Sequence, residues 1–344
     1  MRALILGGSV FVGRRLVELL VADGADVTVL NRGLTNSDLP AGVHRLVADR
    51  TDPSSMRAAL QGTTWDAVFD VSGFVMAAGG GDIDGLLDLF EQRVGRYVFV
   101  SSVMAYDQSL VGIAPWTEDM PTALTTGDTA NHAATGTYGG FKALAESRML
   151  ARHHERGLPV CIVRPAAIYG PHNNIHDMET AMFLRLLQGR PILLPHGGLV
   201  TGSYGHVDDL CAAMMAMVNA PAAVGQVFNV TAEAVTTRRY VHALAAIVGV
   251  QPDIVDVPDA ALAALPNGVF GHLFSVRHHA VLAVDKAARL VGVRPAFDFQ
   301  TGHRDAYEWF LSVGRDQVDA PLLDPVWRAT WDFDAENAAA AMLR

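Results

Sequence analysis

Cysteine is scarce in this chain. Cys161 and Cys211 are the only two among 344 residues, and both lie in apolar runs. Two such residues cannot build the disulfide framework of a small secreted domain, so we expect a reduced, cytoplasmic protein. The N-terminal apolar run ends at Gly7, too early for a secretory signal peptide, and no uninterrupted apolar stretch is long enough to span a bilayer. We therefore expect neither a leader nor a membrane span.

Charge is also sparse. Only 18% of the residues are charged, the formal net charge is −10, and dense runs of Lys and Arg are absent. This balance disfavours a broad surface for nucleic acid or for an anionic membrane. Hydrophobic residues make up 50% of the 344, which is enough to bury a substantial core in one large domain or two modest ones. The composition thus predicts a compact globular protein.

The chain opens with a strand, a glycine turn and the start of a helix. The apolar run 3–6 leads into the turn 7–13, and leucines then recur at helical spacing. Such a turn brings backbone N–H groups and a helix dipole to a dinucleotide pyrophosphate. Val10 stands where the middle glycine of the usual fingerprint is expected, so the motif alone also fits an ordinary α/β turn. The residues expected to contact a dinucleotide here are Gly7, Ser9, Val10, Phe11, Val12 and Gly13.

Strands and helices alternate through the first half of the sequence. The predicted strands are 3–6, 26–30, 43–47, 67–71, 97–101 and 160–163, and the predicted helices are 53–60, 82–94 and 138–156. This alternation is typical of an α/β fold with a doubly wound, parallel Rossmann sheet.

The pattern changes after residue 171. Predicted helices at 180–187, 208–219, 239–248 and 285–290 are separated by Pro- and Gly-rich loops and by short strands at 192–194 and 226–230. We therefore expect three parts. These are a dinucleotide-binding domain over 1–170 to which some later segments return, a smaller mixed α/β substrate lobe over 171–312, and a C-terminal tail over 313–344.

A tyrosine and a lysine, Tyr138 and Lys142, are four residues apart on the predicted helix 138–156, so they lie on one face, one turn apart. A nearby ammonium group favours the phenolate and lowers the pKa of a tyrosine. The pair alone also fits an ordinary helix surface. The strand 97–101 leads into Ser101 and Ser102, and active sites of open α/β sheets lie at the carboxyl ends of strands. A hydroxyl there can hydrogen bond to an oxygen that changes charge during hydride transfer.

With three further motifs, these features resemble the extended short-chain dehydrogenase/reductase superfamily, in its NAD-dependent epimerase/dehydratase branch. The resemblance covers about 1–311, and its motifs are 7–13, 101–106, 138–142, 164–171, 205–210 and 227–230. Segments 7–13, 31–33 and 205–209 are similar to an atypical subgroup that includes chloroplast stem-loop-binding proteins, some of which bind RNA.

The resemblance implies roles for individual residues. Tyr138 is expected to be the general acid/base, and Lys142 to bind the nicotinamide ribose hydroxyls and to lower the pKa of Tyr138. Ser102 aligns with the catalytic Ser/Thr of the family, with Ser101 as the alternative. Ser102 and Tyr138 are 36 residues apart, which is longer than the family pattern, and the extra length lies in the loop 107–136. We therefore expect a substrate pocket that is individual to this protein.

The end of the strand 26–30 bears on the choice of dinucleotide. NAD-binding members place an acidic residue there to hold the adenine ribose hydroxyls, but this chain has Asn31 followed by Arg32. A guanidinium can form a planar fork on a 2′-phosphate, and Arg14 and Arg50 are further candidates nearby. We therefore favour NADP(H) over NAD(H); the alternative is that Arg32 stacks on the adenine.

The resemblance also implies that Asp49 contacts the adenine amino group and that 71–73 line the cofactor. Beyond the glycine turn, the expected cofactor-binding residues are Asn31, Arg32, Asp49, Arg50, Val71, Ser72, Gly73, Ser101, Tyr138, Lys142, Pro165 and Ile168.

These expectations describe an NAD(P)(H)-dependent oxidoreductase that moves a hydride between nicotinamide and a carbinol or carbonyl carbon of a small, sugar-derived substrate. Dehydratase members carry an Asp-Glu pair after the catalytic Ser/Thr, and Val103 and Met104 in those places disfavour elimination. A nucleotide-sugar epimerase with tightly bound NAD is the leading alternative. An RNA-binding protein and a non-catalytic dinucleotide sensor are alternatives of another class. We expect a homodimer that packs through 138–156, and no membrane partner.

Several histidines are possible metal ligands, but their sequence surroundings do not favour a metal site. His172 and His176 are four residues apart but lie in a Pro- and Asn-containing loop without cysteines, so we expect a loop or substrate contact and no metal. Arg277 and His278 fall where related proteins contact the charged portion of a substrate, and we assign them that role as a binding hypothesis.

Overall fold

The computed structural model describes residues 1–34, 38–73, 82–107, 114–124, 137–174, 178–265, 278–313 and 333–344. The chain forms two compact units. Unit 1 comprises Met1–Ala166, Val207–Thr231 and Leu282–Arg294, and unit 2 comprises Ala167–His206, Ala232–Val281 and Pro295–Arg344. The chain therefore leaves unit 1 and returns to it twice.

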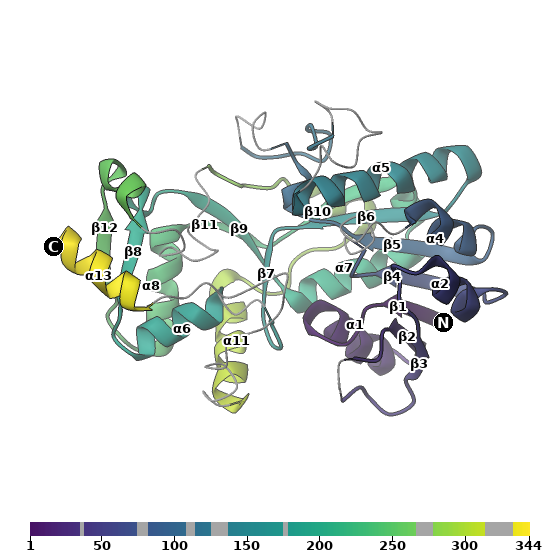
Figure 1. Ribbon diagram of the computed structural model, residues 1–344, viewed down its shortest axis with the longest axis horizontal. Coiled ribbons are helices and arrows are strands. Elements are labelled where there is room, and N and C mark those ends of the chain that lie inside the picture. Colours follow the sequence, from purple (N-terminus) through teal and green to yellow (C-terminus); the bar gives the residue numbers. More distant parts are fainter. Residues whose placement is uncertain are drawn as a thin grey trace. The chain divides into compact units, whose positions relative to one another are not determined.

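Unit 1 is built on a sheet in which seven strands of the described chain are all parallel (Figure 1). In spatial order they are β10 (Gln226–Val230), β6 (Val160–Pro165), β5 (Val94–Val100), β4 (Trp65–Asp70), β1 (Arg2–Leu6), β2 (Asp26–Asn31) and β3 (His44–Val47). The order reverses between β1 and β4, which is the topological switch point of a doubly wound sheet. The predicted Rossmann fold is confirmed.

Helices cover both faces of this sheet (Figure 1). One layer contains α1 (Phe11–Ala22), α7 (Val207–Asn219) and α10 (Asp285–Val291), and the other contains α2 (Pro53–Leu60), α4 (Ile83–Phe90) and α5 (Tyr138–Arg156). The central strands are buried on both sides because of these layers, which explains their continuous apolar runs. Leu87, Phe90 and Met149 are buried between the sheet and the second layer.

Two predicted elements differ from the structure of unit 1. The helix expected over 82–94 ends at Phe90, because β5 already begins at Val94 and Gln92 adopts a left-handed φ of 58° between them. The strand 226–230, expected among the short strands of the smaller lobe, is the edge strand β10 of the large sheet and pairs with β6. Its bounds are as predicted, but its alternating apolar side chains did not reveal which sheet it joins.

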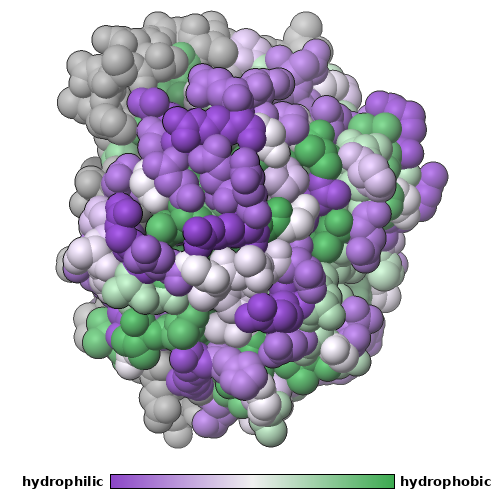
Figure 2. Space-filling view, turned by 90° about the vertical axis from the view of Figure 1, so that its right-hand side faces the viewer, coloured by the Kyte–Doolittle hydropathy of each residue, from purple (hydrophilic) through white to green (hydrophobic). Residues whose placement is uncertain are grey.

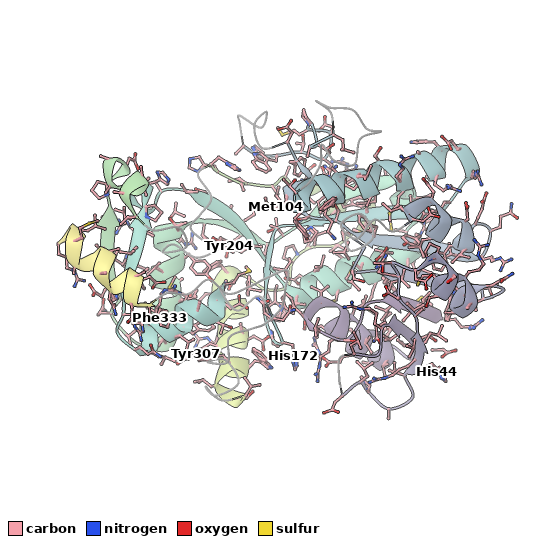
Figure 3. The ribbon with its side chains drawn as sticks, viewed as in Figure 1. His44, Met104, His172, Tyr204, Tyr307 and Phe333 are labelled. Carbon is pink, nitrogen blue, oxygen red and sulfur yellow. The ribbon has the colours of Figure 1, made fainter. Side chains whose placement is uncertain are left out.

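Unit 2 contains two small sheets and four described α-helices. The sheets are β11 (Glu233–Thr236) with β9 (Thr201–His206) and β7 (Ala167–Tyr169), and β12 (Asp253–Val257) with β8 (Pro191–Pro195). The helices are α6 (Glu179–Leu187), α8 (Thr237–Val248), α11 (Phe299–Val313) and α13 (Phe333–Leu343). An aromatic core that includes Tyr204 and Phe183 holds α6, α8 and α11 against the three-stranded sheet, and Tyr307 packs at its edge (Figure 3).

The described part of the C-terminal tail packs within unit 2. Helix α13 lies on β8 and β12 through Ala339 and Ala340, and a buried ion pair joins its Glu336 to Arg185 on α6. Among the described residues, no helix is both long and apolar enough to cross a membrane. The face turned toward the right of Figure 1 is mainly hydrophilic, with smaller hydrophobic patches between (Figure 2).

Candidate cofactor and active site

In the glycine turn between β1 and α1, the backbone at Gly13 lies very close to the backbone at Gly8. A Cβ on Gly13 would lie 2.5 Å from the amide nitrogen of Gly8, so this position accepts only glycine. Gly7 has a φ of +118°, which L side chains rarely adopt. Val10 has an extended backbone (φ −139°, ψ 154°), which explains why a β-branched residue can replace the expected glycine. No described side chain caps the first turn of α1, so its N–H groups can donate hydrogen bonds to an anionic group.

Asn31, at the end of β2, connects this strand to the glycine turn. Its amide nitrogen donates to the Ser9 hydroxyl at 2.8 Å, and its amide oxygen accepts from the Gly33 N–H at 2.8 Å. Both groups of the amide are therefore engaged within the protein. The neutral side chain orders the loop where NAD-binding relatives are expected to present a carboxylate.

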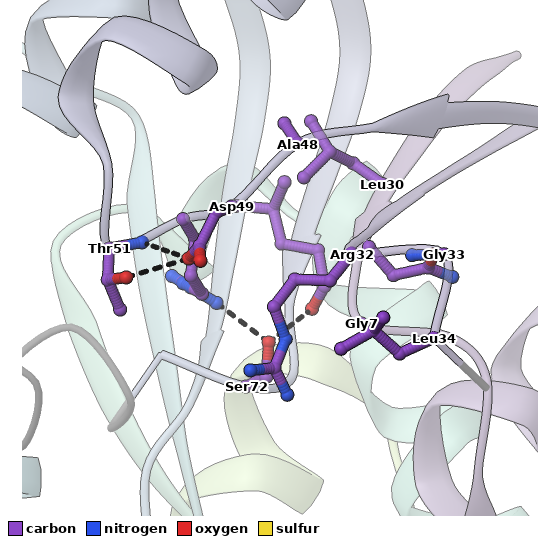
Figure 4. A pocket seen from close by; sticks show the side chains of 12 residues that line it. Gly7, Leu30, Arg32, Gly33, Leu34, Ala48, Asp49, Thr51 and Ser72 are labelled. Atoms are coloured by element: carbon purple, nitrogen blue, oxygen red, sulfur yellow. Dashed lines mark hydrogen bonds between the residues drawn. The ribbon is translucent and has the colours of Figure 1, made fainter.

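A cavity of about 180 Å³ opens beside these residues at the carboxyl ends of β1, β2 and β4. Its lining residues are Leu6, Gly7, Leu30, Asn31, Arg32, Gly33, Leu34, Ala48, Asp49, Arg50, Thr51 and Ser72 (Figure 4). Arg32 extends along the cavity and makes no hydrogen bond or ion pair with another described residue. Hydrogen bonds from the Thr51 hydroxyl and N–H lower the pKa of Asp49, which keeps a carboxylate acceptor in the cavity wall.

Arg50 also lines the cavity, but its guanidinium is engaged. It forms a two-pronged ion pair with the buried Asp70 at 2.8 and 2.9 Å, and it donates to the Ser72 hydroxyl at 2.8 Å. The Tyr97 hydroxyl donates to the same carboxylate at 2.8 Å. Arg14, the other cation considered for a 2′-phosphate, is paired with Glu18 at 3.1 Å. Both arginines are therefore held by carboxylates, whereas the charge of Arg32 acts on Asp49 without a hydrogen bond or ion pair among the described residues.

The segment after β4 is shaped by two close approaches. A Cβ on Gly73 would lie 2.2 Å from the Phe99 ring, and a Cβ on Gly7 would lie 3.1 Å from the Val71 side chain. Val71 and Ser72 therefore lie against the glycine turn, where the cofactor is expected. Pro165 ends β6 in unit 1, and Ile168 belongs to β7 in unit 2.

Ser102, Tyr138 and Lys142 come together at the carboxyl end of β5. Ser102 follows β5 and accepts the Met104 N–H at 3.1 Å, and Tyr138 begins α5. The Thr137 hydroxyl caps α5 by accepting from the Gly140 N–H at 3.1 Å. A Cβ on Gly139 would lie 2.0 Å from the Met104 carbonyl oxygen, so the first turn of α5 packs directly on the Ser102 segment (Figure 3).

The Ser102 hydroxyl interacts with the Tyr138 phenol and acts to lower its pKa. The Lys142 ammonium donates to the Val100 carbonyl oxygen at 2.5 Å and lies 5.6 Å from the centre of the Tyr138 ring. Tyr138 is partly exposed, whereas Lys142 is only 2% exposed. Tyr138 thus lies nearer the surface than Lys142, which the protein encloses.

The charge states differ from one expectation. Burial raises the pKa of Tyr138 to about 12, and the hydrogen bond with Ser102 opposes this rise. Burial lowers the pKa of Lys142 to about 8, although Asp70 and Glu146 favour its charged form. The expected lowering of the Tyr138 pKa by Lys142 is therefore wrong for the ligand-free protein, because desolvation of the phenolate dominates this pKa.

A second buried network lies beside the serines. The Ser101 hydroxyl donates to the Glu146 carboxylate, which also forms an ion pair with Arg164 at 2.6 Å. Ser101 is thus held by Glu146, and it is Ser102 that contacts Tyr138. Sequence reasoning missed Glu146, although its position one turn after Lys142 on the same helix face was a usable signal.

The described part of the loop 107–136 is anchored to unit 1. The buried Asn229 amide donates to the carbonyl oxygens of Trp116 and Ala283 at 3.0 and 3.1 Å, and it accepts from the Tyr106 hydroxyl at 2.7 Å. The Glu118 carboxylate accepts the Asn229 N–H at 2.9 Å. Segment 114–124 is therefore attached to the carboxyl end of β10, near the end of the sheet that carries the site.

The histidine hypotheses stay predictions. The His172 ring lies 5.2 Å from the Trp309 ring in unit 2. His279 accepts the Thr201 N–H at 3.1 Å. His176 and Arg277 lie outside the described residues. Within the described ranges, no group of three or more His, Cys, Asp or Glu side chains could hold a metal ion.

Comparison with known proteins agrees with this geometry. Residues 3–231 match the model of the NAD dependent epimerase/dehydratase family. The chain is 27% identical over 330 residues to the chloroplast stem-loop binding protein of 41 kDa b from Arabidopsis thaliana, covering 91% of this chain and 80% of that protein. It is 29% identical over 144 residues to the UDP-glucose 4-epimerase of Vibrio cholerae, an alignment that covers 41% of this chain and 39% of that enzyme.

Among solved structures, the fold resembles a dTDP-glucose 4,6-dehydratase from Bacillus anthracis in complex with NAD. The TM-score is 0.72 at 19% identity, over 91% of this chain and 97% of that chain. The family model spans more than half of the chain and covers the glycine turn, the serines and the Tyr138–Lys142 pair. The chain therefore belongs to the NAD-dependent epimerase/dehydratase family.

Proposed function

We propose that this protein is an NAD(P)(H)-dependent oxidoreductase in which Ser102, Tyr138 and Lys142 form the catalytic set. The observation that carries this proposal is the interaction of the Ser102 hydroxyl with the Tyr138 phenol, with Lys142 one helical turn away. All three lie at the carboxyl end of the sheet that also bears the glycine turn, where open α/β sheets bind their ligands.

Each residue then has one chemical task. Nicotinamide, when bound, accepts or supplies the hydride at a carbinol or carbonyl carbon. Tyr138 exchanges the proton of the substrate oxygen, and Ser102 donates a hydrogen bond that holds that oxygen. Lys142 binds the ribose hydroxyls, and its ammonium group is held beside the phenol ring by the Val100 carbonyl.

The cavity accounts for the dinucleotide. Its glycine turn accepts the pyrophosphate, and its Asp49 carboxylate can accept from the adenine amino group. Arg32 is the cation of the cavity that is without a partner among the described residues, and a guanidinium forms a strong fork on phosphate. This supports NADP(H) over NAD(H), although the family model and the solved relative above carry the name of NAD.

The substrate class is a small sugar or nucleotide sugar, because UDP-glucose and dTDP-glucose appear in the names of the relatives. The similarity to a UDP-glucose 4-epimerase favours a second candidate, a nucleotide-sugar epimerase that oxidises and re-reduces one carbon with tightly bound NAD. The same Ser–Tyr–Lys set serves both reactions. The two differ in release of reduced cofactor, which only the reductase requires.

The similarity to a stem-loop binding protein supports RNA binding as a candidate of another class. The net charge of −10 opposes it, because phosphate contacts dominate nucleic-acid affinity. Of the partners, a homodimer in the cytoplasm fits best. The second copy would pack against α5, whose Arg152 forms an ion pair with Asp84 on α4 and whose Arg156 forms one with Glu91, the residue that follows α4.

Thermal unfolding with NADP+ and NAD+ at equal concentrations tests the proposal. A ligand that binds only the folded state raises stability by RT ln(1 + [L]/Kd), so the larger shift identifies the tighter ligand. We expect the larger shift with NADP+. An NAD+ preference favours the epimerase, which a panel of UDP- and dTDP-sugars then tests by product analysis. Absence of any shift in protein verified to be free of bound nucleotide contradicts both candidates, and a labelled RNA stem-loop then tests the third.

A further inference from the structure

Lysine is almost absent from this protein. The sequence contains only Lys142 and Lys286, and all other basic side chains are arginines. Lys142 is nevertheless placed in the interior, 2% exposed, on the helix that carries Tyr138. A buried ammonium group is costly unless nearby groups stabilise its charge. The groups around Lys142 therefore determine whether it carries a proton.

The first of these groups is the Arg50–Asp70 pair. Asp70 is fully buried at the end of β4, and its two oxygens accept from both terminal nitrogens of Arg50 and from the Tyr97 hydroxyl. Its register partner on β5 is Phe99, and the Lys142 ammonium lies 5.1 Å from the centre of that ring. The pair acts on Lys142 with opposite signs, since Asp70 favours the charged lysine and Arg50 opposes it.

The second group lies on α5 itself. Glu146, one turn after Lys142, is 2% exposed and also favours the charged lysine. Its carboxylate is occupied by Arg164 from β6 and by the Ser101 hydroxyl. From α5, the Tyr138 ring completes the surroundings, 5.6 Å from the ammonium. Lys142 thus has two buried carboxylates within electrostatic reach, Asp70 on β4 and Glu146 on its own helix. Each carboxylate is paired with an arginine from another segment.

We propose that the Arg50–Asp70 and Arg164–Glu146 pairs are positioning residues for Lys142. Their carboxylates supply negative charge near the ammonium group, and an arginine already holds the oxygens of each carboxylate. An arginine fixes each carboxylate in place and reduces its pull on the lysine. The pairs can therefore favour the ammonium without drawing it away from the Val100 carbonyl and the phenol. This inference rests on the proposed function, because it gives Lys142 a task that depends on its charge.

The Arg50–Asp70 pair also connects two regions of the site. Arg50 and its partner Ser72 line the cavity, and Asp70 acts on Lys142. A ligand in the cavity that changes the contacts of Arg50 would therefore change the charge felt by the lysine. The structure assigns this task to a pair that lies outside the Ser–Tyr–Lys set.

The protonation of Lys142 can be measured directly, because the chain has two lysines. Protein labelled with 13C at the lysine ε-carbon gives two signals, and Lys286→Arg identifies the one from Lys142. We expect Asp70→Asn to shift the midpoint of the Lys142 titration downward by about one pH unit, because Arg50 is then uncompensated. Arg50→Met should shift it upward by a similar amount, because Asp70 is then uncompensated. Glu146→Gln should also shift it downward.

Opposite shifts of the Lys142 midpoint in Asp70→Asn and Arg50→Met distinguish an electrostatic effect from a structural one. A variant that merely loosens the fold would expose Lys142 to water and move its midpoint upward in every case. The double variant Arg50→Met/Asp70→Leu removes both charges together, so its midpoint should lie below that of the native protein and above that of Asp70→Asn. It also guards against misfolding of a single variant. Asp208→Asn is the matched control, since Asp208 forms a comparable ion pair with Arg15 and should leave the midpoint unchanged.

Shifts of one sign in Asp70→Asn and Arg50→Met, or no shift in either, would overturn the inference. The titration is done without ligand, so it stands apart from the proposed function. If NADP+ and NAD+ fail to bind while the midpoints move in opposite directions, the proposed function fails and the electrostatic arrangement holds. If a dinucleotide binds and the midpoints do not move, the function holds and the positioning task fails.

Discussion

The Ser102 hydroxyl interacts with the Tyr138 phenol, although the two residues are 36 positions apart in the sequence. The two side chains are joined because the Ser102 segment and the first turn of α5 pack at Gly139, where even one methyl group would collide with the Met104 carbonyl. The described segments at 102–104 and 137–140 are therefore sufficient to bring the two side chains together.

Replacement of the phenol tests the proton-transfer task. Tyr138→Phe should abolish hydride transfer and leave dinucleotide affinity within about twofold, because it removes one hydroxyl and keeps the buried ring. Stopped-flow absorbance of the reduced cofactor and a binding titration measure the two effects. Thr137→Ser, which retains the helix-capping hydroxyl, is the control. Normal turnover by Tyr138→Phe would disprove the assignment.

Arg32 provides a test of cofactor choice. Arg32→Ala should weaken NADP+ binding about 10- to 100-fold and NAD+ binding little, because a charge-assisted hydrogen bond to phosphate contributes about 1.5–3 kcal/mol. Calorimetric titration with each dinucleotide measures the ratio. Arg14→Ala is the matched control, since that arginine is paired with Glu18. Equal losses for the two cofactors would mean that Arg32 stacks on the adenine.

The glycine turn predicts a sharp contrast between two neighbouring positions. Gly13→Ala should lower the free energy of unfolding by about 1–3 kcal/mol and dinucleotide affinity at least tenfold, because its methyl group would displace Gly8. Val10→Ala should change both little, since Val10 has an extended backbone and is 46% exposed. Urea unfolding and a binding titration check the contrast. An intact site in Gly13→Ala would show that the turn can relax.

His303 makes the stability of unit 2 depend on pH. It is fully buried, stacks on Tyr169 with ring centres 3.7 Å apart, and its Nε2 has no hydrogen-bond partner among the described residues. Burial lowers the pKa of His303 to about 3 from its ordinary 6.5. Below pH 6.5 the unfolded chain therefore binds a proton that the folded chain does not, and the free energy of unfolding falls by up to about 1.4 kcal/mol per pH unit.

His303→Phe should remove this component. Urea unfolding at pH 7 and pH 5 measures it, and the variant should lose less stability than the native protein over this interval. His242→Gln, an exposed position on α8, serves as the control. An identical pH dependence in native protein and His303→Phe would show that other groups cause the acid sensitivity.

Local pattern was sufficient for much of the fold. Helix α5 has the predicted bounds because Thr137 caps one end and Gly157, with a φ of 73°, ends the other. Strands β1 and β2 were readable because both faces are buried, which requires an unbroken apolar run. The end of α4 was misjudged because Val94 suits a helix and a strand equally, and pairing with β4 decides between them.

The candidate site was predictable in its residues but not in its charges. Spacing placed Tyr138 and Lys142 on one helix face, and the ends of strands indicated Ser102. Nothing in the sequence around Arg50 reveals its ion pair with Asp70. Arg50 follows β3 and Asp70 ends β4, so the two side chains meet only after folding. Likewise, the direction in which the Tyr138 pKa shifts depends on how deeply the phenol is buried, and the spacing of residues in the sequence does not reveal this.

The edge strand β10 and helices α7 and α10 are delivered to unit 1 only after the chain has passed through parts of unit 2. A nascent chain that has emerged as far as residue 170 therefore lacks one strand of its sheet and two helices of one layer. Its β6 is an unpaired edge, and the apolar side of α1 that meets α7 has no cover. Unit 1 can therefore be completed only when most of the chain has been synthesised. A fragment that ends at Ala166 would be prone to aggregate and would not bind a dinucleotide.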